Sequence, residues 1–414
     1  MGTNLASTQD EQFNVIYPGR LNGDSGPDFR DAVIVSKSRS MKGDVEVHVR
    51  SSDWYRHRHH ADGEYNNVIL HVVMWHDRES PIVLRSGREV PVLCLARALQ
   101  YQAYLFPHRL PCFPMANHLH THTLSKILDT AGEQRFRQRA DRFRAELEQE
   151  PADQVLFRGI MRALGYAKNT KPFEELARRM PLSRIQATEG LAAKQALLLG
   201  TAALLPSQRR QMEPTKGREV QELEQIWRST DSDIQTMKES DWNLSHIYPN
   251  NSPVRRIIAQ SYLLERYDRG GLLAGILHMV RDAAPPNGRR SLQNSLIVNS
   301  DDYWRDHFDF GIRSRTTVAA LLGQSKVAEI AVNVILPFAL AWGELTDEPG
   351  LADRAMSLYH SHPSLAENCL TQHMRKQLVL ERYSDSTACR QQGLIHIFAN
   401  YCREGRCGEC PLSN

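Results

Sequence analysis

The chain lacks a large excess of either charge. Its 414 residues include 51 lysines and arginines and 48 aspartates and glutamates, which leaves a formal net charge of +3. Such a small excess permits contact with nucleic acid but does not indicate it, so any basic surface has to be local. Hydrophobic residues make up 41% of the chain and charged residues 24%, a composition typical of a globular protein long enough for two or three domains.

Long apolar segments are also missing. The longest, residues 328–342, contains Asn333 and Pro337 and is shorter than the roughly 20 residues that a membrane span needs. The first 12 residues are polar and contain neither the basic nor the apolar segment of a secretory signal peptide. We therefore expect a cytoplasmic protein with no membrane partner. The sequence leaves the oligomeric state open.

Cysteines are few and odd in number, which does not suit the paired disulfides of a small secreted domain. Three of the seven, Cys402, Cys407 and Cys410, have the spacing C-x4-C-x2-C near the C-terminus. The C-x2-C half is a common turn through which two thiolates bind one metal ion. A closed zinc or iron–sulfur site needs a fourth ligand, for which Cys389 and His396 are upstream candidates. The alternative is three reduced thiols without metal.

The chain does contain a strand-rich segment followed by a long helical region. Short β-branched or alternating runs predict strands at 32–35, 45–49, 68–73, 82–84 and 90–95, with no helical period between them. The predicted organisation is a disordered tail (1–12), a β-rich domain (13–104), a proline-rich connector (105–122), a helical domain (123–388) and a final helix with the cysteine turn (389–414). The fold class is therefore α+β, with a mixed N-terminal sheet and a large all-α region.

One predicted strand has an unusual polar face. Within residues 43–49, three valines alternate with Asp44, Glu46 and His48. The two-residue period of a strand places these two acids and the histidine on one face, where they are costly to bury unless something pairs with them. A divalent metal ion is one candidate partner. The alternative is that the three polar side chains lie on a solvated face of the sheet.

A third acid is expected to lie near this face. Asp28 comes 18 residues before Glu46, and a hairpin between them would bring both carboxylates to the same end of the sheet. The pattern of Pro27-Asp28, a hairpin and then Glu46-Val47-His48 resembles the PD-(D/E)xK phosphodiesterase superfamily. The resemblance implies a restriction-endonuclease-like sheet on which the two acids bind Mg²⁺ or Mn²⁺ and a basic residue orients the attacking water.

This resemblance leads to the first hypothesis, a metal-dependent phosphodiesterase that acts on DNA or RNA. Asp28 and Glu46 would hold the metal, with Asp44 as a further candidate ligand. His48 stands where the family has lysine, and it is not reliably charged at neutral pH. His71, on the following strand, is expected to support the site.

A second hypothesis rests on the abundance of histidine, because ten of the 17 histidines lie between positions 48 and 122. A histidine-ligated metal hydrolase would use imidazoles of the HRHH segment (His57, His59 and His60) or His71, together with Asp53 or Asp62. A third hypothesis is a non-catalytic binding or scaffold protein, in which the sheet is a binding module and His48 faces solvent.

Arginines are concentrated on the predicted helix at 131–150. Arg135, Arg139 and Arg142 flank its apolar stripe and could contact phosphates. The alternative is a solvated face whose charge is balanced by acids on the same helix.

Several longer phrases of the sequence resemble one bacterial family of unknown function, domain of unknown function 2851. They are PGRLNGDSGPDF, GDVEVHVRSSDWYRHRHH, YNNVILHVV, ALGYAKNTKPFEELARRMP and QQGLIHIFANYCREGRCGECPL. The resemblance extends from the first strands to the terminal cysteines, and it implies no established activity. The phosphodiesterase hypothesis therefore rests on Asp28, Glu46 and His48 and their resemblance to the PD-(D/E)xK superfamily, and not on this family.

Overall fold

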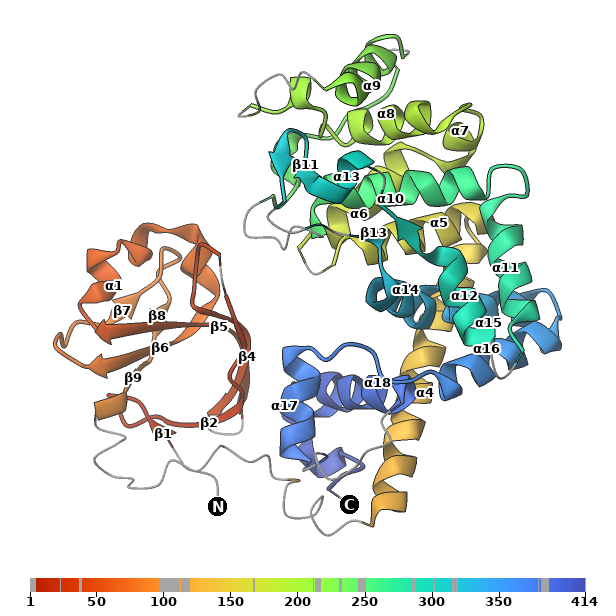
Figure 1. Cartoon of the computed structure of the whole chain (residues 1–414). Coiled ribbons are helices and arrows are strands. Elements are labelled where there is room, and N and C mark those ends of the chain that lie inside the picture. The colour runs from red at the N-terminus through yellow and green to blue at the C-terminus, as the bar shows by residue number, and fades with distance from the viewer. Residues whose placement is uncertain are drawn as a thin grey trace. The chain divides into compact units, whose positions relative to one another are not determined.

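The computed structural model describes residues 5–413 except 23, 37–38, 97–111, 113–119, 167, 211, 213–216, 231–232, 245–250, 285–287, 301, 315–316, 318, 379 and 381–386. The chain forms two compact units (Figure 1). Unit 1 comprises Met1–Gln134 and Glu367–Asn414, and unit 2 comprises Arg135–Ala366. The predicted α+β class is confirmed, because unit 1 contains a mixed sheet and unit 2 is largely helical.

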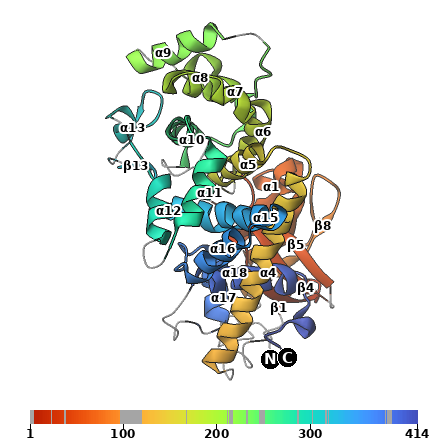
Figure 2. The ribbon, with the colours of Figure 1, turned by 90° about the vertical axis from the view of Figure 1, so that its right-hand side faces the viewer.

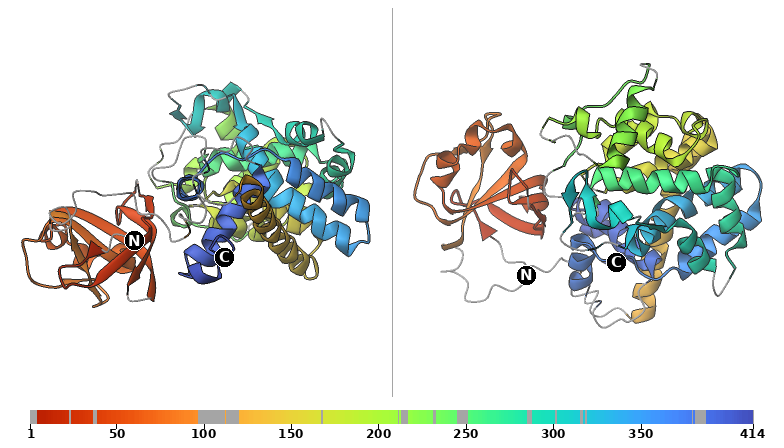
Figure 3. Two further views of the ribbon diagram at one scale, coloured as in Figure 1. Left: turned by 90° about the horizontal axis from the view of Figure 1, so that it is seen from below. Right: turned by 45° about the horizontal axis from the view of Figure 1, so that its top comes forward.

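Unit 1 is built on a seven-stranded sheet with the order β1-β2-β4-β5-β6-β9, in which β3 also pairs with β4. The strands are β1 (Leu5–Ala6), β2 (Gln12–Tyr17), β3 (Arg20–Leu21), β4 (Phe29–Ser36), β5 (Arg39–Arg50), β6 (Val68–Trp75) and β9 (Val92–Cys94). Pairing is antiparallel as far as β5 and parallel from β5 through β6 to β9. The sheet is strongly curved and nearly closes on itself (Figure 3). A separate ribbon pairs β7 (Ile82–Val83) with β8 (Glu89–Val90).

Two connections of this sheet position the candidate site. The β4–β5 hairpin pairs Phe29 with Val45, so Asp28 lies beside Glu46 as the sequence predicts. The parallel strands β5 and β6 require a crossover, which here contains only short helices. These are α1 (Asp53–Arg56) and the 3₁₀ helices η1 (His59–Ala61) and η2 (Gly63–Asn67).

The C-terminal segment completes the core of unit 1. Helices α17 (Cys369–Gln377) and α18 (Ala388–Ile397) share one apolar cluster with the start of α4 (Thr121–Leu147) and with β2 and β4. Within this cluster the ring of Tyr17 lies 5.1 Å from that of Phe398. The sequence-based division set residues 389–414 apart, whereas in the structure they pack against the N-terminal sheet.

Unit 2 is a helical assembly around the second half of α4. The ring of Phe136 on α4 stacks at 4.2 Å on Tyr359 of α16 (Pro349–Ser361), and Phe143 contacts Phe338 of α15 (Leu336–Leu345). Figure 2 shows α15 and α16 beside α4. The other helices are α5 (Ala152–Leu164), α6 (Thr170–Arg179), α7 (Leu182–Gln186), α8 (Leu191–Thr201), α9 (Arg218–Arg228), α10 (Pro253–Arg266), α11 (Leu272–Asp282), α12 (Gly288–Leu296), α13 (Asp302–Asp306) and α14 (Gln324–Ile330). Two small ribbons pair β10 (Val298–Asn299) with β13 (Ala320–Leu322) and β11 (His307–Asp309) with β12 (Ile312–Arg313).

The N-terminal segment differs from the expectation of a disordered tail. Residues 5–12 form β1, a turn and the start of β2. Leu5 is buried, and the hydroxyl of Ser7 accepts hydrogen bonds from the backbone N–H groups of Gln9 and Glu11. A buried apolar side chain and a closed turn therefore order a segment whose composition is mostly polar. Most of the predicted connector at 105–122 lies outside the described residues.

One helical stretch of the described chain, Gln324–Leu345, is long and apolar enough to cross a membrane. In the structure 72% of its most apolar window is buried, as is typical of a core helix. By itself this stretch is weak evidence for a membrane span.

Candidate metal centre

The polar face of β5 points into the protein. The side chains of Glu46 and His48 are only 6% and 8% exposed, whereas Val47 and Val49 on the opposite face are 38% and 63% exposed. This pattern reverses the usual arrangement, in which the valines of a half-buried strand face the core. A solvated polar face therefore does not describe this strand. Burial of a carboxylate requires compensating partners, and these are provided by the crossover that follows the strand.

Three imidazoles and one carboxylate meet at this point. The nearest ring nitrogens of His48, His57 and His59 all lie within 4.8 Å of one another. His48 Nε2 is 3.0 Å from His57 Nδ1. The Oε1 atom of Glu46 lies 3.3 Å from Nε2 of His48 and 3.3 Å from Nε2 of His59. Strand β5 thus supplies two members of the cluster, and the crossover supplies the other two.

The backbone of the crossover turns sharply between its two histidines. Arg58 adopts a left-handed conformation, with φ 63° and ψ 24°, which is uncommon for a residue other than glycine. His57 ends α1, and His59 begins η1. Because of this turn, two side chains that are two residues apart reach the same point. Strained backbone of this kind is found disproportionately at functional sites.

Aromatic rings form the wall behind the cluster. The imidazole of His59 stacks on Tyr65 at 3.9 Å, and Trp54 lies 5.4 Å from His59 and 5.2 Å from His71. Trp54 is fully buried and donates a hydrogen bond from Nε1 to the carbonyl of Val83. The wall fixes the ring of His59 and lowers the local polarity around Glu46.

The two remaining acids of the first hypothesis lie close to Glu46 but have other partners. The backbone N–H of Asp28 donates to Glu46 Oε2 at 3.0 Å, and the Asp28 carboxylate accepts from the N–H of Val47 at 2.9 Å. Burial and the nearby Glu46 raise the pKa of Asp28. Asp44 forms an ion pair with Arg30 at 3.0 Å and accepts from a backbone N–H. Asp28 therefore borders the cluster, whereas Asp44 is held by Arg30.

His71 lies directly behind His48. It is fully buried on β6, where it pairs in register with Glu46, and its Nε2 lies 2.9 Å from His48 Nδ1. Burial, followed by the neighbouring His48, lowers the pKa of His71 to about 3, so its ring is neutral. Either ring can donate at this contact; where His71 accepts at Nε2, His48 donates from Nδ1. The lone pair of His48 Nε2 then faces Glu46 and His57.

The three imidazoles approach the spacing of ligands around a tetrahedral metal ion. Ligands bound at 2.0–2.1 Å to a tetrahedral zinc ion are roughly 3.3 Å apart. Three of the six separations among Glu46, His48, His57 and His59 are 3.0–3.3 Å, and the ligand atoms of the three histidines all lie within 4.8 Å of one another. In addition, the Nε2 atom of His59 is buried and has no hydrogen-bond partner in the described part of the chain. An orphaned imidazole nitrogen next to a buried carboxylate is the arrangement that a metal ion would satisfy.

The cysteine prediction has a different outcome. Cys402 and Cys410 lie in the apolar core of unit 1 together with Cys112, which the sequence analysis did not consider. Burial and the thiols of Cys410 and Cys407 raise the pKa of Cys112 to about 12. The sulfur of Cys389 instead donates to the carbonyl of Asp129 at 3.3 Å. Among the described residues no three cysteines come close enough to share a metal ion, and the zinc or iron–sulfur site stays a prediction.

The cluster combines residues that the sequence analysis divided between two hypotheses. Glu46 and His48 belong to the nuclease-like hypothesis, and His57 and His59 belong to the histidine-ligated one. His60 does not join them, because its ring lies against Tyr55 at 5.0 Å. Two indications of this cluster were visible in the sequence: the alternation of polar and apolar residues on β5 and the HRHH spacing. The turn at Arg58, which brings them together, has no sequence pattern.

Comparison with known proteins identifies a family whose function is unknown. A family model described as "Protein of unknown function (DUF2851)" matches residues 2–368. The chain belongs to this family. Searches of curated proteins and of solved structures return no match to this DUF2851 chain. The matched range contains the whole metal-site cluster and ends before the terminal cysteines, so the predicted family resemblance is confirmed up to residue 368. The PD-(D/E)xK resemblance stays a prediction.

Proposed function

We propose that this DUF2851 protein is a metal-dependent hydrolase whose centre is formed by Glu46, His48, His57 and His59, and that its substrates are phosphodiesters. The convergence of three imidazoles and a buried carboxylate supports this proposal most strongly. A structural metal site would be closed by four protein ligands that are all buried. A catalytic zinc site keeps one position for water, so we assign the metal ligands to the three imidazoles and leave the fourth position open beside the exposed His57.

The donor atoms favour one class of metal ion. Mg²⁺ prefers six oxygen ligands, whereas imidazole nitrogens suit zinc and other transition metals. A set of three nitrogens and one oxygen therefore favours zinc over the Mg²⁺ expected from the nuclease-like motif, with Mn²⁺ as an intermediate case. A metal ion of this kind would supply Lewis acidity for the substrate and for the attacking water.

The chain's own residues divide the remaining tasks. The three histidines would hold the metal ion, Glu46 lies against His48 and His59, and His71 orients the ring of His48 through the contact at its Nδ1. Asp28 holds the strand next to Glu46 through two hydrogen bonds. Its pKa, raised by burial and by Glu46, also makes it a candidate for accepting a proton from water.

Cations at the open side favour a phosphodiester over a neutral substrate. Arg58 is exposed between two of the proposed ligands, and Arg56, also exposed, pairs with Asp53 at 2.9 Å. Guanidinium groups bind phosphate oxygens in a bidentate manner. The nuclease-like order of Asp28, Glu46 and His48 points to the same substrate class. Either DNA or RNA fits these features.

The test is hydrolysis by the full-length protein. Labelled single- and double-stranded DNA and RNA, and the general probe bis(p-nitrophenyl) phosphate, would be incubated with protein loaded with Zn²⁺, Mn²⁺ or Mg²⁺. The variants are Glu46→Gln and His59→Gln. His60→Gln is the matched control, because His60 belongs to the same HRHH segment but packs against Tyr55.

We expect metal-dependent hydrolysis that falls at least 100-fold in Glu46→Gln and His59→Gln and stays within twofold of wild type in His60→Gln. Hydrolysis that survives Glu46→Gln would contradict the proposed centre. Absence of hydrolysis on every probe, with folded and metal-loaded protein, would contradict the catalytic proposal and favour the non-catalytic binding protein.

A further inference from the structure

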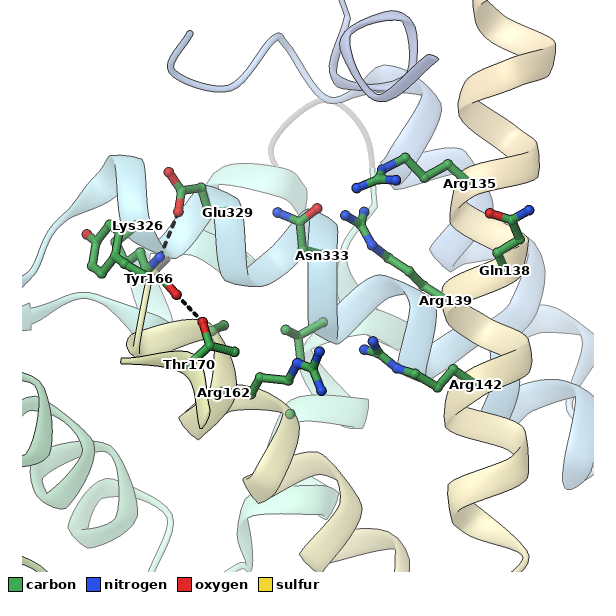
Figure 4. A pocket seen from close by; sticks show the side chains of 13 residues that line it. Arg135, Gln138, Arg139, Arg142, Arg162, Tyr166, Thr170, Lys326, Glu329 and Asn333 are labelled. Carbon is green, nitrogen blue, oxygen red and sulfur yellow. Dashed lines mark hydrogen bonds and ion pairs between the residues drawn. The ribbon is translucent and has the colours of Figure 1, made fainter. Parts of the chain in front are cut away.

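A strongly basic cavity lies within unit 2. Its volume is about 690 Å³, and α4, α5, α14 and the π-helical segment Ala331–Ile335 contribute its walls. Five cationic side chains line it, against one carboxylate, that of Glu329. The cations are Arg135, Arg139, Arg142, Arg162 and Lys326. Figure 4 shows the three arginines of α4 on one wall and Arg162 on the wall opposite Arg142.

The three arginines of α4 form a row. Their positions, four and then three residues apart, place them on one face of the helix. At 1.5 Å per residue the row from Arg135 to Arg142 extends over about 10 Å. This length exceeds what a single phosphate group can contact. Of the two expectations for these arginines, phosphate contact and a solvated face, the second omitted the cavity that all three side chains line.

Like charges face one another across and along the cavity. The pKa of Arg142 is lowered by burial and then by Arg162, and that of Arg139 is lowered by burial and then by Arg135. Two acids outside the cavity offset part of this charge. Glu146 lies 3.6 Å from Arg142, and Glu174 lies 3.1 Å from Arg162. The lining itself contains five cationic side chains and one carboxylate, a charge balance that suits an anionic ligand.

A further polar group also points to a ligand. Asn333 lines the cavity from the π-helical segment, a rare helix form that occurs often at functional sites. Its Oδ1 atom is inaccessible to solvent and has no hydrogen-bond partner in the described part of the chain. Figure 4 shows Asn333 among the lining side chains, between Glu329 and the arginines of α4 in this view. A buried amide atom without a partner is costly unless a ligand or water completes it.

We propose that this cavity binds a small molecule that carries two or more phosphate groups. The volume suits a nucleotide-sized ligand, and guanidinium forks match phosphate oxygens in geometry and charge. Lys326, which is buried and ion-paired to Glu329 at 2.8 Å, adds a point charge at the far side from α4. This site lies wholly within unit 2 and does not depend on the proposed hydrolase centre.

The test is calorimetric titration of the full-length protein with pyrophosphate, ATP and a 12-nucleotide single-stranded DNA. All titrations contain EDTA, so that phosphate binding at a metal centre does not contribute. The main variant is Arg139→Gln with Arg142→Gln, and Arg162→Gln tests the opposite wall independently. Arg137→Gln is the matched control, because Arg137 lies on the same helix but is exposed and pairs with Glu344. Circular dichroism establishes that each variant is folded.

We expect pyrophosphate and ATP to bind wild type and Arg137→Gln equally, and to bind the double variant and Arg162→Gln at least tenfold more weakly. Three outcomes would overturn the proposal. The first is no binding of either ligand by wild type. The second is an equal loss in Arg137→Gln, which would indicate general charge attraction. The third is binding of the oligonucleotide that ATP does not displace, which would indicate a nucleic-acid groove.

Discussion

The Nδ1 atom of His48 lies 2.9 Å from the Nε2 atom of His71, which is fully buried on the neighbouring strand. Because burial keeps His71 neutral, this contact orients the imidazole of His48 and leaves its Nε2 lone pair directed at Glu46 and His57. Second partners of this kind are typical of metal-ligating histidines. His71 is therefore a positioning residue of the proposed centre.

Replacement of His71 tests this role. His71→Leu removes the acceptor while keeping an apolar side chain, and we expect it to weaken Zn²⁺ binding about 10- to 100-fold. His71→Gln retains an acceptor and should lose less affinity. Competition with a chelating dye measures both values. Equal affinity of His71→Leu and wild type would show that His48 needs no such partner.

The left-handed turn at Arg58 permits a second test, which separates metal binding from substrate binding. Arg58→Gly accepts the positive φ without strain, so we expect normal Zn²⁺ affinity but slower phosphodiester hydrolysis, because the cation is lost. Arg58→Val should destabilise this turn by about 1–2 kcal/mol and weaken Zn²⁺ binding. Arg58→Asn is the control, since asparagine tolerates this conformation. Tight Zn²⁺ binding by Arg58→Val would show that the turn does not position His57 and His59.

Asp77 holds the start of the crossover that supplies His57 and His59. Its carboxylate accepts hydrogen bonds from the Ser52 N–H at 2.9 Å and from the hydroxyls of Ser51 and Ser52. These hydrogen bonds lower the pKa of Asp77 to about 2, and the bond from the Ser52 N–H has the largest effect. Because the folded-state pKa is lowered, the stabilisation is complete above the ordinary pKa near 4 and is lost as the pH falls toward 2.

We therefore expect Asp77→Ala to lower the free energy of unfolding by roughly 1 kcal/mol at pH 7. The difference from wild type should shrink between pH 5 and pH 2. Urea unfolding at several pH values measures this. A difference that is constant over that range would show that the Asp77 charge contributes nothing.

The terminal cysteines yield a separate prediction about metal content. If Cys402, Cys407 and Cys410 bind zinc or an iron–sulfur cluster, Cys410→Ser should lose that metal, and Cys112→Ser should lose it too if Cys112 is the fourth ligand. Cys389→Ser is the control, because its thiol lies against the Asp129 carbonyl. Elemental analysis of the purified proteins decides between these cases. Loss of metal in Cys389→Ser alone would restore the original assignment of the fourth ligand.

Much of the fold follows from the sequence. The alternation of valines with polar residues predicted β5, and the apolar run around His71 predicted β6. The pairing of β4 with β5 was also predictable, since the hairpin spacing places Asp28 beside Glu46. The order of the polar segment before β2 was harder to predict, because it comes from one buried leucine and from a turn that a serine hydroxyl closes.

The candidate site was predictable only in parts. The two-residue period of a β-strand predicted that Glu46 and His48 share a face of the sheet. It did not predict that this face is buried. That outcome depends on the crossover, whose Trp54, His59 and Tyr65 cover the strand. Likewise, the arginine row of α4 was visible, but the opposite wall comes from the next helix, α5, and from α14, which lies far away in the sequence. Tertiary contacts of this kind have no local pattern.

The most direct test of the proposed centre is the zinc content of the protein after loading and removal of free metal. The wild-type protein, the double variant His57→Ala with His59→Ala, and the control His60→Ala would be compared by elemental analysis. We predict that the double variant holds one zinc equivalent per chain fewer than wild type, whereas His60→Ala holds the same amount as wild type. Equal zinc content in all three proteins would contradict a metal centre at Glu46, His48, His57 and His59.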